Sequence, residues 1–326
     1  MKGKLLRFTT IVTLLAVVML MGVGIVQAEE YRFVIVPKVV HPWFDKVNEG
    51  AKEMAQILEQ ETGDKFIIDY RAPSTASVVE QNRILEQAAA TNPNGITLDL
   101  LDAEGNRPVL KAILDRGIPI VVFDSYPPEG MKLTTVQNDF VAQQIAACER
   151  LMEVMKEAKP GKEVYKVALI EGVPTAPNHK MRFETSKKFF QGRSDVEIVA
   201  EGVDNDSIEQ AQKQAASIIA AHPDLDGIIA HNAAGPIGVG LAIKEAGKVG
   251  EIVHVGLDDL DQLLELIKEG VVDSSMSTKP KMQGAFATLC LWLQNLGVDT
   301  PEFVDTGFVH ITKDMIPENV KEWKGF

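Results

Sequence analysis

Cysteine and positive charge are both scarce in this sequence of 326 residues. The two cysteines, Cys148 and Cys290, are too few for a disulfide framework or for a four-thiolate zinc site. The chain has 33 Lys and Arg residues against 46 Asp and Glu residues, which gives a formal charge of −13 at pH 7. Nucleic-acid binding needs a basic surface that neutralises phosphates. These scarcities exclude a disulfide-stapled scaffold and argue against a nucleic-acid partner.

The common catalytic and cofactor-binding motifs are absent from the sequence as well. It contains no GxSxG elbow, no HExxH pair, no GxxxxGK[ST] loop and no GxGxxG that opens a helix after a strand. His41, His179 and His231 each follow a predicted strand, so they either form a metal site together or act separately as hydrogen-bonding loop residues. We favour the second interpretation and expect no enzymatic activity, no metal and no cofactor.

The N-terminal segment has the features of a secretory signal peptide. Three cations in the first seven residues precede a mostly apolar, uncharged stretch over residues 8–26. Val26 and Ala28 then place small residues at positions −3 and −1 of a cleavage site. We expect cleavage after Ala28 and a soluble protein in the periplasm. A retained membrane anchor is the alternative, because the apolar stretch approaches the length of a membrane span.

Short apolar runs alternate with amphipathic stretches along the rest of the chain. The runs are rich in Val and Ile and are apolar on both faces, which is typical of parallel strands buried between helices. Predicted strands are residues 33–36, 66–70, 95–100, 118–123, 166–170, 196–200, 227–230 and 252–256. Predicted helices are residues 44–58, 78–90, 107–114, 140–155, 208–221, 237–246 and 262–268. The pattern occurs twice, so we predict an α/β fold of two doubly wound, parallel-sheet lobes.

Polar residues gather where the predicted strands end. In open parallel sheets, ligands bind outside the carboxyl ends of the strands. We therefore expect a cleft between the lobes that is lined by Lys38, His41, Asp124, Ser125, Asn178, His179, Lys180, Asn232 and Asp258.

Two adjacent aromatics, Trp43 and Phe44, open the first helix beside this expected cleft. They either pack in the core or offer a flat face to the C–H groups of a sugar. Asp124 and Asp258 can accept hydrogen bonds from paired hydroxyls. Two carboxylates in a cleft also repel an anion, so a neutral polyhydroxylated ligand is favoured. Donors are supplied by Lys180, Arg182 and Asn232.

At these residues the chain resembles a known family. The segments VIVPKVVHPWFDKVNEGAKEMA, GIPIVVFDSY, DGIIAHNAAGPIGVGLAI and VHVGLDD are similar to periplasmic sugar-binding proteins of ABC importers, in the ribose/galactose-type cluster. The resemblance covers nearly all of residues 31–312. It implies a type I periplasmic binding protein fold, whose two lobes are joined by three crossovers and close on the ligand. The crossovers are expected near residues 137–139, 278–280 and 300–303.

The resemblance also implies a division of the chain and a set of ligand contacts. One lobe comprises residues 29–137 plus 279–301, and the other comprises residues 138–278 plus 302–326. By position in the ribose-type pattern, the contacts are His41, Trp43, Phe44, Asp124, Lys180, Arg182, Asn232, Asp258 and Thr278. Where that pattern has an arginine after the aspartate, this chain has Ser125.

A second branch, the autoinducer-2- and rhamnose-binding proteins, is similar to this chain at VPKVV, FDSYPPE and VPTAPNH. That similarity implies Lys38, Asn178 and His179 in the pocket beside Asp124. We therefore expect a monomeric receptor that captures a neutral sugar or polyol and delivers it to an ABC permease. The alternative is a sensory co-receptor that presents a sugar or an autoinducer-2-like signal to a membrane histidine kinase.

Overall fold

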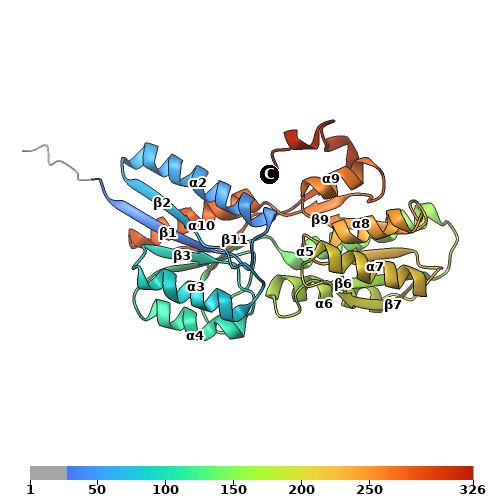
Figure 1. The fold of residues 1–326 in the computed structure, drawn as a ribbon, viewed down its shortest axis with the longest axis horizontal. Helices are drawn as coiled ribbons and strands as arrows, with labels where there is room; N and C mark the ends of the chain where they lie inside the picture. Colours follow the sequence, from blue (N-terminus) through green and yellow to red (C-terminus); the bar gives the residue numbers. More distant parts are fainter. Residues whose placement is uncertain (1–27, 326) are drawn as a thin grey trace, which may run out of the picture.

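Two sheets of six strands each form the centres of two lobes that lie along the long axis of the molecule (Figure 1). The structure is a computed structural model that describes residues 28–325. The first sheet contains β1 (Glu30–Val36), β2 (Lys65–Tyr70), β3 (Gly95–Leu98), β4 (Ile120–Phe123), β5 (Thr134–Gln137) and β11 (Phe303–Asp305). The second contains β6 (Tyr165–Glu171), β7 (Val196–Val203), β8 (Gly227–Ala230), β9 (Val253–Leu257), β10 (Ser275–Ser277) and β12 (Val309–Ile311).

Both sheets are almost entirely parallel. The strand order is β11-β5-β4-β3-β1-β2 in the first sheet and β12-β10-β9-β8-β6-β7 in the second. Among the described strands, only the edge strand β12 is antiparallel to its neighbour, β10. Strands β3, β4 and β8 are buried along their whole length, as parallel strands covered on both faces must be. The predicted fold of two doubly wound parallel sheets is confirmed.

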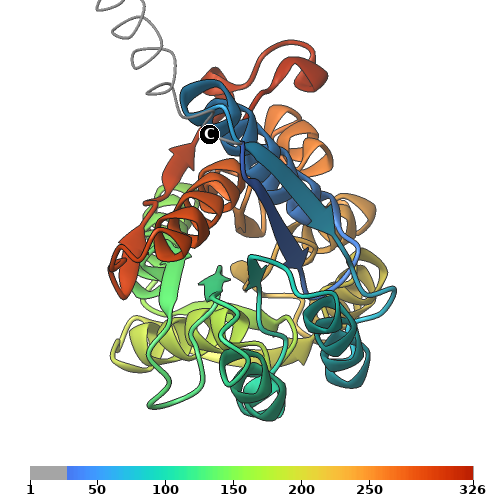
Figure 2. The same ribbon diagram turned by 90° about the vertical axis from the view of Figure 1, so that its left-hand side faces the viewer.

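Helices cover both faces of each sheet (Figures 1 and 2). On the first sheet, α2 (Pro42–Thr62) and α10 (Pro280–Asn295) pack on one face, and α3 (Val78–Ala90) and α4 (Ala103–Leu114) pack on the other. On the second sheet, α5 (Phe140–Ala158) and α6 (Pro177–Gln191) lie opposite α7 (Ile208–Ala221), α8 (Gly235–Glu245) and α9 (Asp261–Lys268). The predicted bounds of α3 and α7 agree with the structure. Ser77 and Ser207 cap the first turns of these helices and so fix where they begin.

The helix α10 returns to the first lobe and crosses α2 at two glycines. A Cβ atom on Gly50 would overlap the carbonyl oxygen of Lys281, and one on Gly284 would overlap that of Val47. Only glycine permits so close an approach of two helix backbones. This contact fixes the start of α2, which carries the aromatic pair, against the rest of the first lobe.

The chain passes from one lobe to the other three times. The first two connections follow β5 and β10, near the expected residues 137–139 and 278–280. The third was expected at residues 300–303, but Phe303, Val304 and Asp305 pair with β5 and remain in the first sheet. The third connection therefore follows Asp305, and the predicted boundary between residues 301 and 302 is a few residues too early.

Two further predictions concern the termini and the cysteines. The signal peptide predicted for residues 1–28 lies, apart from Ala28, outside the described residues. Between residues 28 and 325 no helix has the length and apolar character needed to cross a bilayer. Cys148 and Cys290 are both buried and free, and they belong to different lobes.

Candidate functional site

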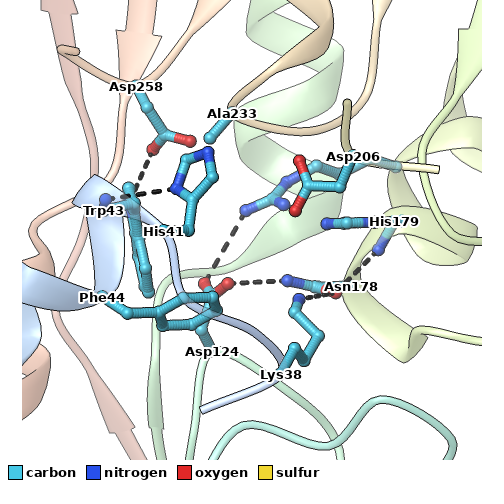
Figure 3. A pocket seen from close by; sticks show the side chains of 11 residues that line it. Lys38, His41, Trp43, Phe44, Asp124, Asn178, His179, Asp206, Ala233 and Asp258 are labelled. Carbon is cyan, nitrogen blue, oxygen red and sulfur yellow. Dashed lines mark hydrogen bonds and ion pairs between the residues drawn. The ribbon is translucent and has the colours of Figure 1, made fainter. Parts of the chain in front are cut away.

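Side chains that follow the strand ends of both lobes meet in a cavity between the lobes (Figure 3). The cavity has an empty volume of about 270 Å³, which includes space open to solvent. Its lining residues are Lys38, His41, Trp43, Phe44, Asp124, Asn178, His179, Arg182, Asp206, Ala233 and Asp258.

The N-terminus of α2 supplies the aromatic wall of this cavity. Trp43 and Phe44 are both buried, and their rings are perpendicular with centroids 5.1 Å apart. Trp43 Nε1 donates to Asp258 Oδ1 at 3.2 Å and to Thr278 Oγ1 at 3.0 Å. Both aromatics also belong to a core cluster. The aromatic pair therefore packs in the core and also lines the cavity.

A chain of polar contacts crosses from the first lobe to the second and back. Lys38 Nζ forms an ion pair with Asp99 Oδ2 at 3.0 Å and donates to Asn178 Oδ1 at 3.1 Å. Asn178 Nδ2 then donates to Asp124 Oδ2 at 2.6 Å. Burial raises the pKa of Asp99 well above its ordinary value, although the Lys38 charge opposes this shift. These contacts hold a cation, an amide and a carboxylate at fixed positions around the cavity.

Two carboxylates face the cavity from opposite lobes, and both residues have a left-handed backbone. Asp124 follows β4 with φ 44°, and Asp258 follows β9 with φ 69°. Such backbone strain in a non-glycine residue concentrates at functional sites. Asp124 Oδ1 lies 3.8 Å from the Arg182 guanidinium and accepts from Gln283 Nε2 at 3.4 Å. Burial raises the pKa of Asp124, and the charges of Arg182 and Lys38 limit that rise.

The two histidines of the cavity have defined hydrogen-bonding roles. His179 Nδ1 accepts the backbone N–H of Val173 at 2.9 Å, and His41 Nδ1 accepts that of Trp43 at 3.2 Å. Because a backbone N–H can only donate, the proton of each neutral ring must lie on Nε2. Burial lowers the pKa of His179 well below its ordinary value. Both rings therefore present an N–H donor through Nε2.

Nine of the residues predicted from the sequence line the cavity, with His179 among them, and four do not. Lys180 is exposed, because it lies two residues from Asn178 and Arg182, which share one face of α6 through their i, i+4 spacing. Ser125 is buried without a hydrogen-bond partner for its hydroxyl. Thr278 lies behind the cavity, where its hydroxyl donates to Asp258. These three side chains do not line the cavity.

The fourth residue, Asn232, points away from the cavity. Its side chain donates to the buried Asp204 and accepts from the backbone N–H of Gly235. Burial raises the pKa of Asp204 to about 8, so this carboxyl needs the donor that Asn232 provides. Asn232 thereby connects the end of β7 to the start of α8, and its position after a strand did not reveal this local role.

Two residues that line the cavity, Asp206 and Ala233, were missed in the sequence analysis. Asp206 follows β7 with φ 58°, so the strand-end rule could have found it. Ala233 has a small apolar side chain, which no sequence pattern marks as a ligand contact.

His231 does not join the other histidines, since its ring contacts Ser186 Oγ and the Ile170 carbonyl. Within residues 28–325 no cluster of three or more His, Cys, Asp or Glu could hold a metal ion.

The chain is similar to curated proteins and solved structures along most of its length. The D-ribose/D-allose-binding protein of Pseudomonas aeruginosa is 26% identical over 293 residues, which cover 88% of this chain and 89% of that protein. The ribose import binding protein of Bacillus subtilis is 23% identical over 250 residues, 76% of each chain. The structure of a glucose-galactose binding protein from Geobacillus stearothermophilus has a TM-score of 0.80 and 26% identity, covering 89% of this chain and 99% of that one.

The comparison with protein families agrees with these similarities and with the lobes and cavity described above. The model of the periplasmic binding protein domain matches residues 32–294. The chain therefore belongs to the periplasmic binding protein family.

Proposed function

We propose that this protein captures a neutral sugar or polyol in the cavity between its lobes and delivers it to an ABC permease in the membrane. As a member of the periplasmic binding protein family it is a binding protein and not an enzyme. The observation that carries the proposal is the set of hydrogen-bond donors and acceptors that line the cavity. Acceptors and donors from both lobes surround a space beside two aromatic rings, Trp43 and Phe44.

The charges of the cavity favour an uncharged ligand. Asp124, Asp206 and Asp258 supply three carboxylates, whereas Lys38 and Arg182 supply two cations. The cations are already occupied, because Lys38 pairs with Asp99 and Arg182 lies near Asp124. An anionic ligand would meet uncompensated carboxylates in a site with little water. Hydroxyl groups, which both donate and accept, match carboxylates and N–H donors equally well.

Binding is proposed to use a hinge motion of the two lobes. The interior of the cavity has room for about one water molecule, so the lobes must separate before a sugar can enter. Three connections between the lobes provide the hinge. We propose that residues 29–137 with 279–305 move as one body, and that residues 138–278 with 306–326 move as the other. The ligand then stabilises the closed arrangement by contacting both lobes.

Relatives and the N-terminal sequence support the proposed site of action. The similar protein of Bacillus subtilis is named an import binding protein. The N-terminal pattern favours removal of residues 1–28 as a signal peptide and release of the protein into the periplasm, where we propose that it acts as a monomer. N-terminal sequencing of the protein recovered from the periplasm tests this part: the chain should begin at Glu29, and a chain that begins at Met1 would contradict it.

Isothermal titration calorimetry against pentoses, hexoses, 6-deoxyhexoses and inositols tests the ligand class. We expect saturable heat with at least one neutral compound and none with the matching uronate or sugar phosphate. Asp124→Ala should weaken that binding by ~10-fold or more, because a hydrogen bond to a charged group contributes about 1.5–3 kcal/mol. The control Asp115→Ala changes an exposed aspartate that caps the C-terminal end of α4, away from the strand ends that form the cavity. Tighter binding of an anion than of its neutral counterpart would refute the proposal.

A further inference from the structure

A second, wider cavity adjoins the inner cavity and shares His41, Trp43 and Asp206 with it. Its empty volume is about 1,390 Å³, part of which is open to solvent. We call this space the outer chamber. The beginning of α2 forms its wall on the first lobe, and the beginnings of α7, α8 and α9 form its wall on the second lobe.

The outer chamber remains open although the lobes already touch at the inner cavity. Trp43 in the first lobe donates to Asp258 in the second, and Lys38 in the first donates to Asn178 in the second. These direct contacts set the distance between the lobes next to the chamber. The width of the chamber is therefore not a consequence of separated lobes, and closure by the hinge would not remove it.

The lining of the outer chamber differs from that of the inner cavity. Apolar side chains form much of it: Pro42, Trp43, Ile208, Ala234, Ile237 and Leu260. The charged lining residues are mostly acids: Asp45, Asp206, Glu209, Asp259 and Asp261. Among these lining residues, all within the described chain, Lys46 is the only lysine or arginine. An apolar surface with an acidic edge suits an uncharged or cationic group of low polarity, and it repels an anionic one.

We propose that the natural ligand is a glycoside, with its sugar ring in the inner cavity and its uncharged or cationic aglycone in the outer chamber. This inference rests on the proposed function and names the ligand class more narrowly. The proposal rests on the shared wall of the two spaces: Trp43 lines both, so a substituent on a sugar held beside it can extend into the chamber.

Calorimetry with matched ligands tests the proposal. For each sugar in the panel, we compare the free sugar, both anomers of its methyl glycoside, both anomers of its phenyl glycoside, and the 4-carboxyphenyl glycosides. We expect one phenyl anomer to bind at least as tightly as the free sugar, and its 4-carboxyphenyl analogue to bind at least ~10-fold more weakly. If both phenyl anomers bind more than ~10-fold more weakly than a free sugar that does bind, the chamber is not a ligand site, although the proposed function stands.

A variant that fills the chamber separates the two spaces. Ile208, the half-buried first residue of α7, lines only the outer chamber. Ile208→Trp should weaken binding of the phenyl glycoside at least ~10-fold and change binding of the free sugar less than ~3-fold. Gln262→Trp, at an exposed position of the same lining, repeats the test if the first variant fails to fold. The control Ser217→Trp adds the same bulk to an exposed position of α7 outside the chamber.

The outcomes distinguish this proposal from the function on which it rests. Equal losses for the phenyl glycoside and the free sugar in both chamber variants would overturn the proposal. Binding of a phenyl glycoside when no free sugar binds would support it. If neither free sugars nor glycosides bind, the proposed function fails and the glycoside proposal fails with it.

Discussion

The ion pair between Lys38 and Asp99 makes a strong prediction about stability. The exposed fraction of the side chain is 3% for Lys38 and 0% for Asp99, and Nζ lies 3.0 Å from Oδ2. Lys38→Met would leave the buried Asp99 carboxylate without its cation. Removal of one partner of a buried pair costs about 3–5 kcal/mol, whereas replacement of both by apolar residues is often neutral. We therefore expect Lys38→Met to lower the free energy of unfolding by about 3–5 kcal/mol at pH 7.

Urea denaturation of the wild type, Lys38→Met, Asp99→Leu and the double variant measures this coupling. The double variant should regain at least about 2 kcal/mol relative to Lys38→Met. Burial raises the pKa of Asp99, and loss of Lys38 raises it further. The unfolded-state titration is common to both proteins, so the extra penalty in Lys38→Met appears only as the pH rises past the folded-state pKa of Asp99 in the wild type, which lies above the ordinary value. The loss should thus be smaller at pH 5 than at pH 7. A loss below about 1 kcal/mol, or a double variant no more stable than Lys38→Met, would refute this reasoning.

Three further predictions concern other parts of the molecule. Burial raises the folded-state pKa of Asp204 to about 8, so its charge should destabilise the fold increasingly from pH 4 to pH 8; the melting temperature of Asp204→Asn should fall less over this range than that of the wild type. Gly284→Ala should lower the free energy of unfolding by about 1–3 kcal/mol, because its Cβ would overlap the Val47 carbonyl oxygen; an unchanged denaturation midpoint would contradict the helix contact. His179→Leu should weaken ligand binding about 5-fold through loss of the Nε2 donor, as the Nδ1 contact with Val173 implies; His179→Gln should restore part of that affinity in calorimetry.

The apolar periodicity of the sequence predicted most of the fold, and it failed where polar residues face inward. The strand β5 has the sequence TTVQ and is buried along its length. Three of its four residues are polar, so the apolar pattern did not predict a strand there. The helix α6 was missed for a related reason, because its buried residues include Asn178, His179 and Arg182. In α6, the residues that line the cavity therefore weaken the apolar pattern of the helix that carries them.

The strand-end rule located the site but could not orient each side chain. It found Asp124 and Asp258, since any residue that directly follows a central parallel strand lies near the edge where both lobes meet. It included Lys180 because the helical phase of α6 was not considered. It included Asn232 because the demand of the buried Asp204 for a donor becomes visible only when both residues are placed in space.

The most direct test of the account is a crystal structure of the protein with the compound that calorimetry identifies. The account predicts a sugar ring between the lobes, beside Trp43 and Phe44, with hydroxyl groups bonded to Asp124 and Asp258. A ligand bound on one lobe only, or between the lobes without contact to either carboxylate, would contradict it.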